Sequence, residues 1–219
     1  MNTIDVQPVT TLYGYSESYW LIDGKPIVRY LDEYVRDGKC PALERFGSLL
    51  GLLPAWSGEL EWAAENRFIW EMIDSPGTLN VPILVCEDDC DLSCIVILAR
   101  IRKTEDFIFW DKIGLLLHEN EDFDLEQRAG IANLDSYSEK DWEMYGGNIA
   151  WEEFGSREFF NWVGENWQEE LLRRRRNYTL PYMQKDGNIF WIEDVNWVFT
   201  AGQYNHMVEK FREIYRQNQ

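Results

Sequence analysis

Histidine is nearly absent from this chain: only His118 and His206 occur among its 219 residues. A catalytic serine or cysteine needs a base close by, and that base is nearly always a histidine. Neither histidine belongs to a Gly-x-Ser-x-Gly or Cys-His signature, and no glycine-rich phosphate loop occurs. We therefore expect no enzyme activity and no cofactor.

Long apolar runs and a leader sequence are also missing. No run approaches the ~20 apolar residues of a membrane-spanning helix, and the N-terminal MNTIDVQPVT has neither a basic region nor an apolar one. We therefore expect a cytoplasmic protein that does not bind membranes. Cys40, Cys86, Cys90 and Cys94 are then expected as reduced thiols without a metal, since their spacing does not match the common zinc modules.

Positive charge is scarce as well. The chain has 21 Lys and Arg against 39 Asp and Glu, which gives a formal net charge of −18. A field of this sign repels nucleic acid and attracts basic partners. The hydrophobic fraction of 45% is still that of a folded protein. The length and the lack of a low-complexity linker predict a single domain over residues 1–219.

The strongest β pattern is a pair of apolar runs, 81–86 and 94–101, that flank the acidic sequence 87–91. These runs predict an antiparallel hairpin whose strands are covered on both faces. Further strands are expected at 18–24, 107–116 and 188–199.

Helices are expected before and after this block of strands. Pro26 opens the first, and the apolar spacing continues it through 27–36. Thr200 and Gln203 form a capping box for the last, which runs to about Tyr215. Other helices are expected at 58–73, from Ser138 to the glycines at 146–147, and at 157–176. Because strict βαβ alternation is missing, the order predicts an α+β fold with a central antiparallel sheet flanked by helices.

The only basic run is Arg173 to Arg176. Consecutive helical residues point around the axis at ~100° steps, so the run does not form one phosphate-binding stripe. Glu169 and Glu170 can pair with Arg173 and Arg174 at i, i+4 spacing. We favour this structural role over RNA binding.

Three acidic runs in the middle third of the chain form the predicted partner-binding surface. Their carboxylates would steer a basic partner, and the aromatic side chains among them would supply desolvated contacts. A solvated acidic surface is the alternative for any single run. The residues assigned to this surface are Asp88, Asp89, Asp91, Glu119, Glu121, Asp122, Asp124, Glu126, Asp141, Trp142 and Tyr145.

The chain resembles bacterial immunity proteins of polymorphic-toxin and contact-dependent growth inhibition systems. The features that carry this resemblance are the acidic runs 87–91 and 119–126, the missing leader and the aromatic-rich α+β pattern. The resemblance implies a cytoplasmic inhibitor without catalysis that binds and blocks a cognate toxin domain, frequently a basic nuclease.

Two other functions stay open. Aromatic residues next to acids, such as Trp70-Glu71 and Trp110-Asp111, would suit a small enzyme or binding protein for a carbohydrate or polar metabolite. The acidic composition also suits a scaffold or a nucleic-acid mimic, whose carboxylates would be spaced like phosphates along a ridge.

Overall fold

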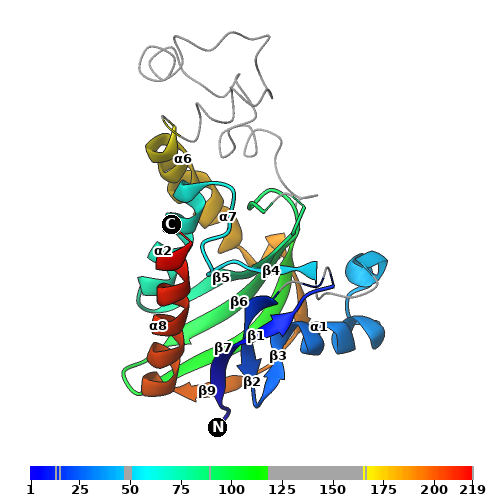
Figure 1. Cartoon of the computed structure of the whole chain (residues 1–219). Coiled ribbons are helices and arrows are strands. Elements are labelled where there is room, and N and C mark those ends of the chain that lie inside the picture. The colour runs from blue at the N-terminus through cyan, green and yellow to red at the C-terminus, as the bar shows by residue number, and fades with distance from the viewer. Residues whose placement is uncertain are drawn as a thin grey trace.

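The computed structural model describes residues 1–12, 14, 16–46, 51–88, 90–117, 165 and 167–218. Within them the predicted α+β fold is confirmed, since helices flank a large antiparallel sheet. In Figure 1, α2 (Ala63–Asp74) and α8 (Ala201–Gln217) stand to the left of this sheet, and α1 (Ile27–Arg36) stands to its right.

The larger sheet has the strand order β4-β5-β6-β7-β8, and β9 also pairs with β7. Its centre is the predicted hairpin, in which β5 and β6 pair from Thr78↔Arg102 to Val85↔Val96. The strand predicted at 107–116 is confirmed as β7, beside β6. The bounds are β4 Leu53–Pro54, β5 Thr78–Val85, β6 Val96–Lys103, β7 Phe107–Leu116, β8 Ile189–Glu193 and β9 Trp197–Thr200.

The strand predicted at 188–199 is two strands rather than one. β8 pairs with the second half of β7, and β9 pairs with the first half. The register of β7 shifts around Asp111. Between β8 and β9, Asn196 adopts a left-handed φ of 50°, and its backbone N–H donates to the Asp111 carbonyl (3.2 Å). The edge strand therefore breaks where its partner is bulged.

A smaller sheet holds β1 (Ile4–Thr10), β2 (Ser16–Ile22) and β3 (Lys25–Pro26). β1 was not predicted, although its buried Ile4 and Val6 alternate with the more exposed Asp5 and Gln7. β2 ends, as predicted, at a turn through Asp23 and Gly24. Both turn residues have positive φ, 50° and 78°, as a two-residue type I′ hairpin turn requires. α1 follows directly after Pro26 and confirms the first predicted helix.

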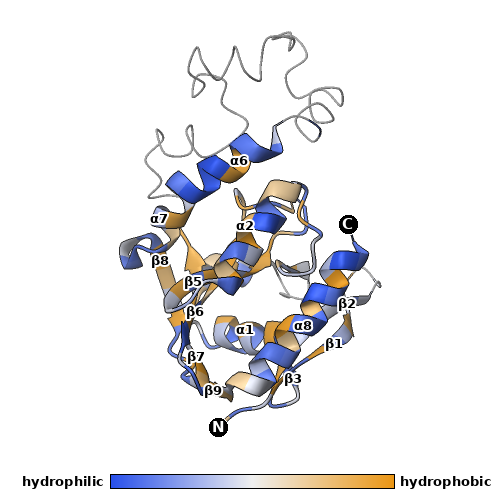
Figure 2. Cartoon of the chain, turned by 90° about the vertical axis from the view of Figure 1, so that its left-hand side faces the viewer, coloured by the Kyte–Doolittle hydropathy of each residue, from blue (hydrophilic) through white to orange (hydrophobic). Residues whose placement is uncertain are grey.

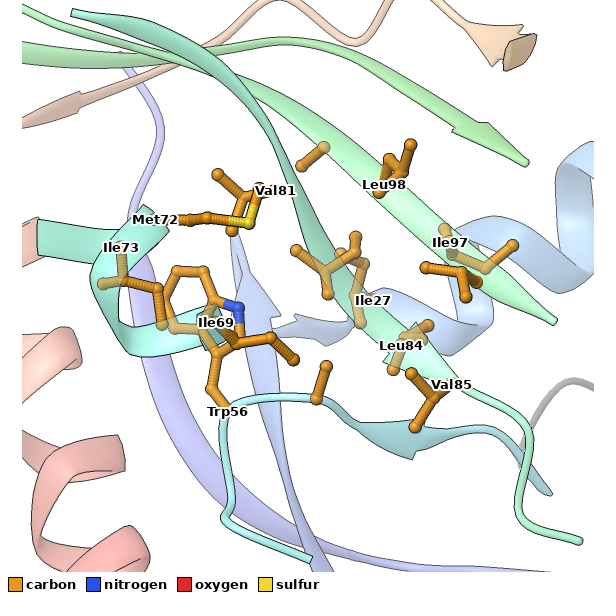
Figure 3. Close-up of a cluster of buried hydrophobic side chains, with 14 of the residues drawn as sticks. Ile27, Trp56, Ile69, Met72, Ile73, Val81, Leu84, Val85, Ile97 and Leu98 are labelled. Carbon is orange, nitrogen blue, oxygen red and sulfur yellow. The ribbon is translucent and has the colours of Figure 1, made fainter. Parts of the chain in front are cut away.

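Aromatic rings fill the space between the two sheets and the helices. Trp20 of β2 contacts Trp56 at a ring-centroid distance of 5.0 Å and Phe211 of α8 at 4.6 Å. Figure 3 shows Met72 of α2 directed toward Val81 of β5. In Figure 2 the strands of the larger sheet are mostly hydrophobic, whereas α6 and α8 carry many hydrophilic residues. The tryptophans that are buried in the described chain are Trp20, Trp56, Trp62, Trp70, Trp110, Trp167 and Trp197.

α2 begins at Ala63, later than the predicted start at Gly58. Gly58 belongs instead to a close approach between the chain before α2 and the end of α8. A Cβ at Gly58 would lie 2.6 Å from Tyr215 Cδ2, and its φ of 88° is left-handed. α8 itself confirms the predicted final helix: the Thr200 hydroxyl accepts a hydrogen bond from the Gln203 N–H (3.2 Å).

The long helix predicted at 157–176 is interrupted, and its first part lies outside the described residues. α6 spans Gln168–Arg174, and Trp167 before it is not helical. The chain then continues as a π-helical turn, η7 (Arg175–Thr179), and as α7 (Leu180–Met183). The helix predicted from Ser138 also lies outside the described residues.

Each arginine of the basic run binds an acid, which supports the structural interpretation. Glu170 accepts from Arg173 and from Arg174, whose Nε lies 2.8 Å from Glu170 Oε1. Arg175 and Arg176 turn to α2, where they bind Glu65 and Glu71. Glu169 pairs with Arg67 of α2 rather than with the predicted Arg173. The run therefore joins α6 and η7 to α2.

Candidate partner-binding surface

The loop between β5 and β6 is a closed turn held by its own backbone. The Cys86 N–H donates to the Ile95 carbonyl (3.0 Å), and the Cys90 N–H donates to the Cys86 carbonyl (3.1 Å). Cys90 has a left-handed φ of 49°. Asp91 then fixes the next turn, because its Oδ1 accepts from the Ser93 backbone N–H (2.8 Å). The loop is thus an ordered platform for its acidic side chains.

A second acidic segment lies against this loop. The Glu61 N–H donates to the Cys90 carbonyl (2.8 Å), which ties the chain before α2 to the loop. Glu59 and Glu61 are both exposed. At the end of α8, Asn218 Nδ2 donates to the Ser57 carbonyl (3.1 Å) and to Glu59 Oε1 (3.4 Å). Glu59 and Glu61 therefore stand on a segment that is anchored from both sides.

β2 contributes a further acid, Glu17. Burial, the charge of Glu59 and a hydrogen bond between the two carboxyl groups together raise the pKa of Glu17 to about 7. Two carboxylates in contact repel each other, so Glu17 takes up a proton near neutral pH. A positively charged side chain of a partner that binds between Glu17 and Glu59 would replace that proton.

We call the six acids of these segments the acidic rim: Glu17, Glu59, Glu61, Glu87, Asp88 and Asp91. Three of them, Glu59, Glu61 and Glu87, lie close enough to Cys90 to act on its thiol. The pKa of the Cys90 thiol is raised to about 11. Burial is the main cause, and the charges of Cys86, Glu59, Glu61 and Glu87 add to it. Cys90 is therefore held as a neutral thiol in the middle of the rim, and it is not an activated nucleophile.

Many of the described acids pair with Lys or Arg, as in Lys25–Glu33 (2.6 Å) and Lys210–Asp5 (2.5 Å). Most rim acids do not, and the rim differs from single unpaired acids such as Glu105 and Asp106 in that its acids come together from three segments. Within the described residues, five rim acids form no ion pair: Glu17, Glu59, Glu61, Asp88 and Asp91. Their negative charge is thus open to a cation from outside.

A buried ion pair lies beneath the rim. Glu65, in the first turn of α2, is 0% exposed and binds Arg175 of η7, which is 7% exposed. Burial raises the pKa of Glu65 to about 7 against the attraction of Arg175, and the charge of Asp91 adds to the increase. The rim is therefore coupled electrostatically to the contact between α2 and η7.

Two of the predicted site residues, Asp88 and Asp91, lie in the rim. Asp88 is exposed and Asp91 is partly buried. The other predicted residues lie outside the described residues: Asp89, Glu119, Glu121, Asp122, Asp124, Glu126, Asp141, Trp142 and Tyr145. Glu17, Glu59 and Glu61 were not predicted. The sequence offers one signal for two of them. In Glu59-Leu60-Glu61 an apolar residue alternates with two acids, and the structure buries Leu60 and exposes both acids.

One exposed aromatic side chain lies at the same end of the sheet as the rim. Phe190 of β8 is 42% exposed and pairs with Leu115 of β7, which in turn pairs with Ile97 at the start of β6. Phe107, 39% exposed, lies at the opposite end of β7. Phe190 is thus an apolar contact point two strands away from the β5–β6 loop.

Among the described residues, no group of three or more His, Cys, Asp or Glu side chains is arranged to hold a metal ion. No helix in the described part of the chain has the length and apolar character needed to cross a membrane. Comparison of the chain with protein-family models, curated proteins and solved structures gives no match.

Proposed function

We propose that this protein is an immunity-type inhibitor that binds a basic toxin domain, such as a nuclease, through the acidic rim, and that it acts in the cytoplasm. The observation that carries the proposal is the gathering of five carboxyl groups that form no ion pair within the described residues. Four stand on segments fixed by backbone hydrogen bonds, and Glu17 stands on β2. Lysine and arginine side chains of a partner would supply the missing positive charge.

The rim suits both the long-range attraction of a basic partner and the contacts of the bound complex. Its charge, added to the net charge of −18, attracts a basic domain over distances of about a Debye length. At contact, an arginine between Glu17 and Glu59 would take the place of the proton on Glu17. Phe190 offers apolar area at the same end of the sheet. Nucleic acid and membranes would be repelled by the same charge.

The carbohydrate alternative gains no support from Glu17 and Glu59, the closest acids of the rim among the described residues. Glycosidases hold their two carboxyl groups about 5–9 Å apart so that the sugar or a water fits between them. Glu17 and Glu59 lie close enough for a hydrogen bond between them to raise the pKa of Glu17. A scaffold or nucleic-acid mimic would need a ridge of carboxylates, whereas the rim is gathered around one loop.

The test is association with the basic protein that copurifies from the native operon. Glu61→Lys/Asp88→Lys reverses two exposed acids whose side chains make no hydrogen bonds within the described residues. Glu105→Lys/Asp106→Lys, in the turn between β6 and β7, makes the same charge change at the far end of the sheet. The rim variant should associate about tenfold or more slowly at low salt, and the control should change much less.

Equal slowing by both variants would mean that the net charge of the protein, and not the rim, determines the association rate. No slowing by either variant would remove the rim from the interface. Circular dichroism of both variants checks that the fold is retained.

A further inference from the structure

A continuous series of ring contacts links the tryptophan core to tyrosines on α1. The ring centroids of Trp56 and Trp110 are 6.4 Å apart, and those of Trp110 and Trp197 are 6.3 Å apart. Trp197 lies 5.0 Å from Tyr30, which lies 6.5 Å from Tyr34. The three tryptophans are buried, whereas both tyrosines are partly exposed. These separations are those of aromatic rings in contact.

Contacting rings of this kind can pass a single electron from one to the next. Indole is the most easily oxidised aromatic side chain, so a missing electron, or hole, rests on tryptophan first. Trp56 Nε1 donates its hydrogen bond to the Pro82 carbonyl (2.7 Å), which is too weak a base to take the proton. The oxidised ring then keeps its positive charge, and that charge can move along the series.

The chemistry of the phenol gives the movement a direction. An oxidised tyrosine loses its phenolic proton and becomes neutral, whereas the oxidised indole of Trp56 keeps its charge. Tyr30 and Tyr34 form the partly exposed end of the series. The ammonium groups over their rings are each paired with an acid, Lys25 with Glu33 (2.6 Å) and Lys39 with Glu193, so they do not repel a hole. The hole is therefore drawn toward α1.

We propose that Trp56, Trp110 and Trp197 conduct one-electron oxidation out of the core to Tyr30 and Tyr34. A small inorganic radical takes one electron from an indole and becomes an anion. The indole radical cation then takes an electron from the phenol. The Tyr30 hydroxyl donates to the Ile22 carbonyl (3.0 Å), so the proton passes to water from the partly exposed Tyr34. A dissolved thiol returns a hydrogen atom to the tyrosyl radical, which leaves the buried indoles intact. This route is independent of partner binding.

Pulse radiolysis of the full chain with the azide radical, which oxidises tryptophan selectively, tests the proposal. The tryptophan radical should convert to a tyrosyl radical at a rate that does not depend on protein concentration, and spin trapping with peptide mapping should locate it on Tyr30 or Tyr34. Trp197→Phe should slow the conversion. Trp191→Phe is the control, because Trp191 makes no aromatic ring contact within the described part of the chain.

If Trp197→Phe unfolds the protein, a second variant, Tyr30→Phe/Tyr34→Phe, still tests the proposal. It removes only two hydroxyl groups and leaves both rings in place. This variant should lose the fast tyrosyl signal, as should the wild type in urea. An unchanged rate and yield in the tyrosine double variant, or adducts mainly at Tyr215, would overturn the proposal.

Discussion

Removing the guanidinium of Arg175 tests the buried ion pair beneath the rim. Arg175 Nη2 donates to Glu65 Oε1, and Nη1 donates to Thr179 Oγ1 (3.2 Å). Glu65 Oε2 has no hydrogen-bond partner within the described residues. Arg175→Met keeps much of the apolar stem and leaves Glu65 without its counter-ion. Because Glu65 is fully buried, an ionised carboxylate there would cost about 3–5 kcal/mol of folding free energy.

The size of this loss should depend on pH. Burial and Asp91 already raise the pKa of Glu65 to about 7, and the loss of Arg175 removes the main opposing attraction. Glu65 will then take up a proton near neutral pH, so the cost will be smaller at about pH 5.5 than at about pH 8. Glu65→Gln/Arg175→Met carries no buried charge and should recover at least ~1 kcal/mol of the loss.

These four proteins form a double-mutant cycle: the wild type, Arg175→Met, Glu65→Gln and the double variant. Urea unfolding of each at the two pH values measures the free energy of unfolding that the cycle needs. Strictly additive losses, or an Arg175→Met loss that is the same at both pH values, would refute the reasoning.

Two further predictions concern stability. Glu17 and Glu65 both have a pKa raised to about 7. Their favourable contribution is present in full below the unfolded-state pKa and is lost as pH rises through about 7, so the melting temperature of the wild type should increase from about pH 8 to about pH 5.5. A flat melting profile across that window would contradict the raised pKa values. Gly58→Ala should destabilise the fold by about 1–3 kcal/mol, because its Cβ would clash with Tyr215 and its φ is left-handed. Gly77→Ala has the same sign of φ but open space around it, so urea titration should give it the smaller loss.

Local patterns predicted the elements whose stabilising contacts are close in sequence. The β5–β6 hairpin follows from its two apolar runs, α1 from Pro26 and its apolar spacing, and α8 from the Thr200 cap. The break between β8 and β9 depends on the bulge at Asp111 of a different strand, and Gly58, which was predicted in α2, instead packs closely against Tyr215 of α8. Neither distant contact leaves a mark in the local sequence.

The same distinction applies to the candidate site. Asp88 and Asp91 were found because they belong to one acidic run. Glu17 and Glu59 come from segments far apart in the chain, and only the packing of β2 against the segment before α2 brings their carboxyl groups into hydrogen-bond contact. The pairing of Arg175 with Glu65 was missed because 110 positions separate the two residues in the sequence.

The most direct test of the acidic rim is amide hydrogen exchange in the complex with the copurifying basic protein. The account predicts that exchange slows at residues 57–62 and 86–95, including the Glu61 amide that bonds to Cys90, with little change at the turn between β6 and β7. Protection confined to that turn or to the exposed face of α8, with the rim unchanged, would contradict it.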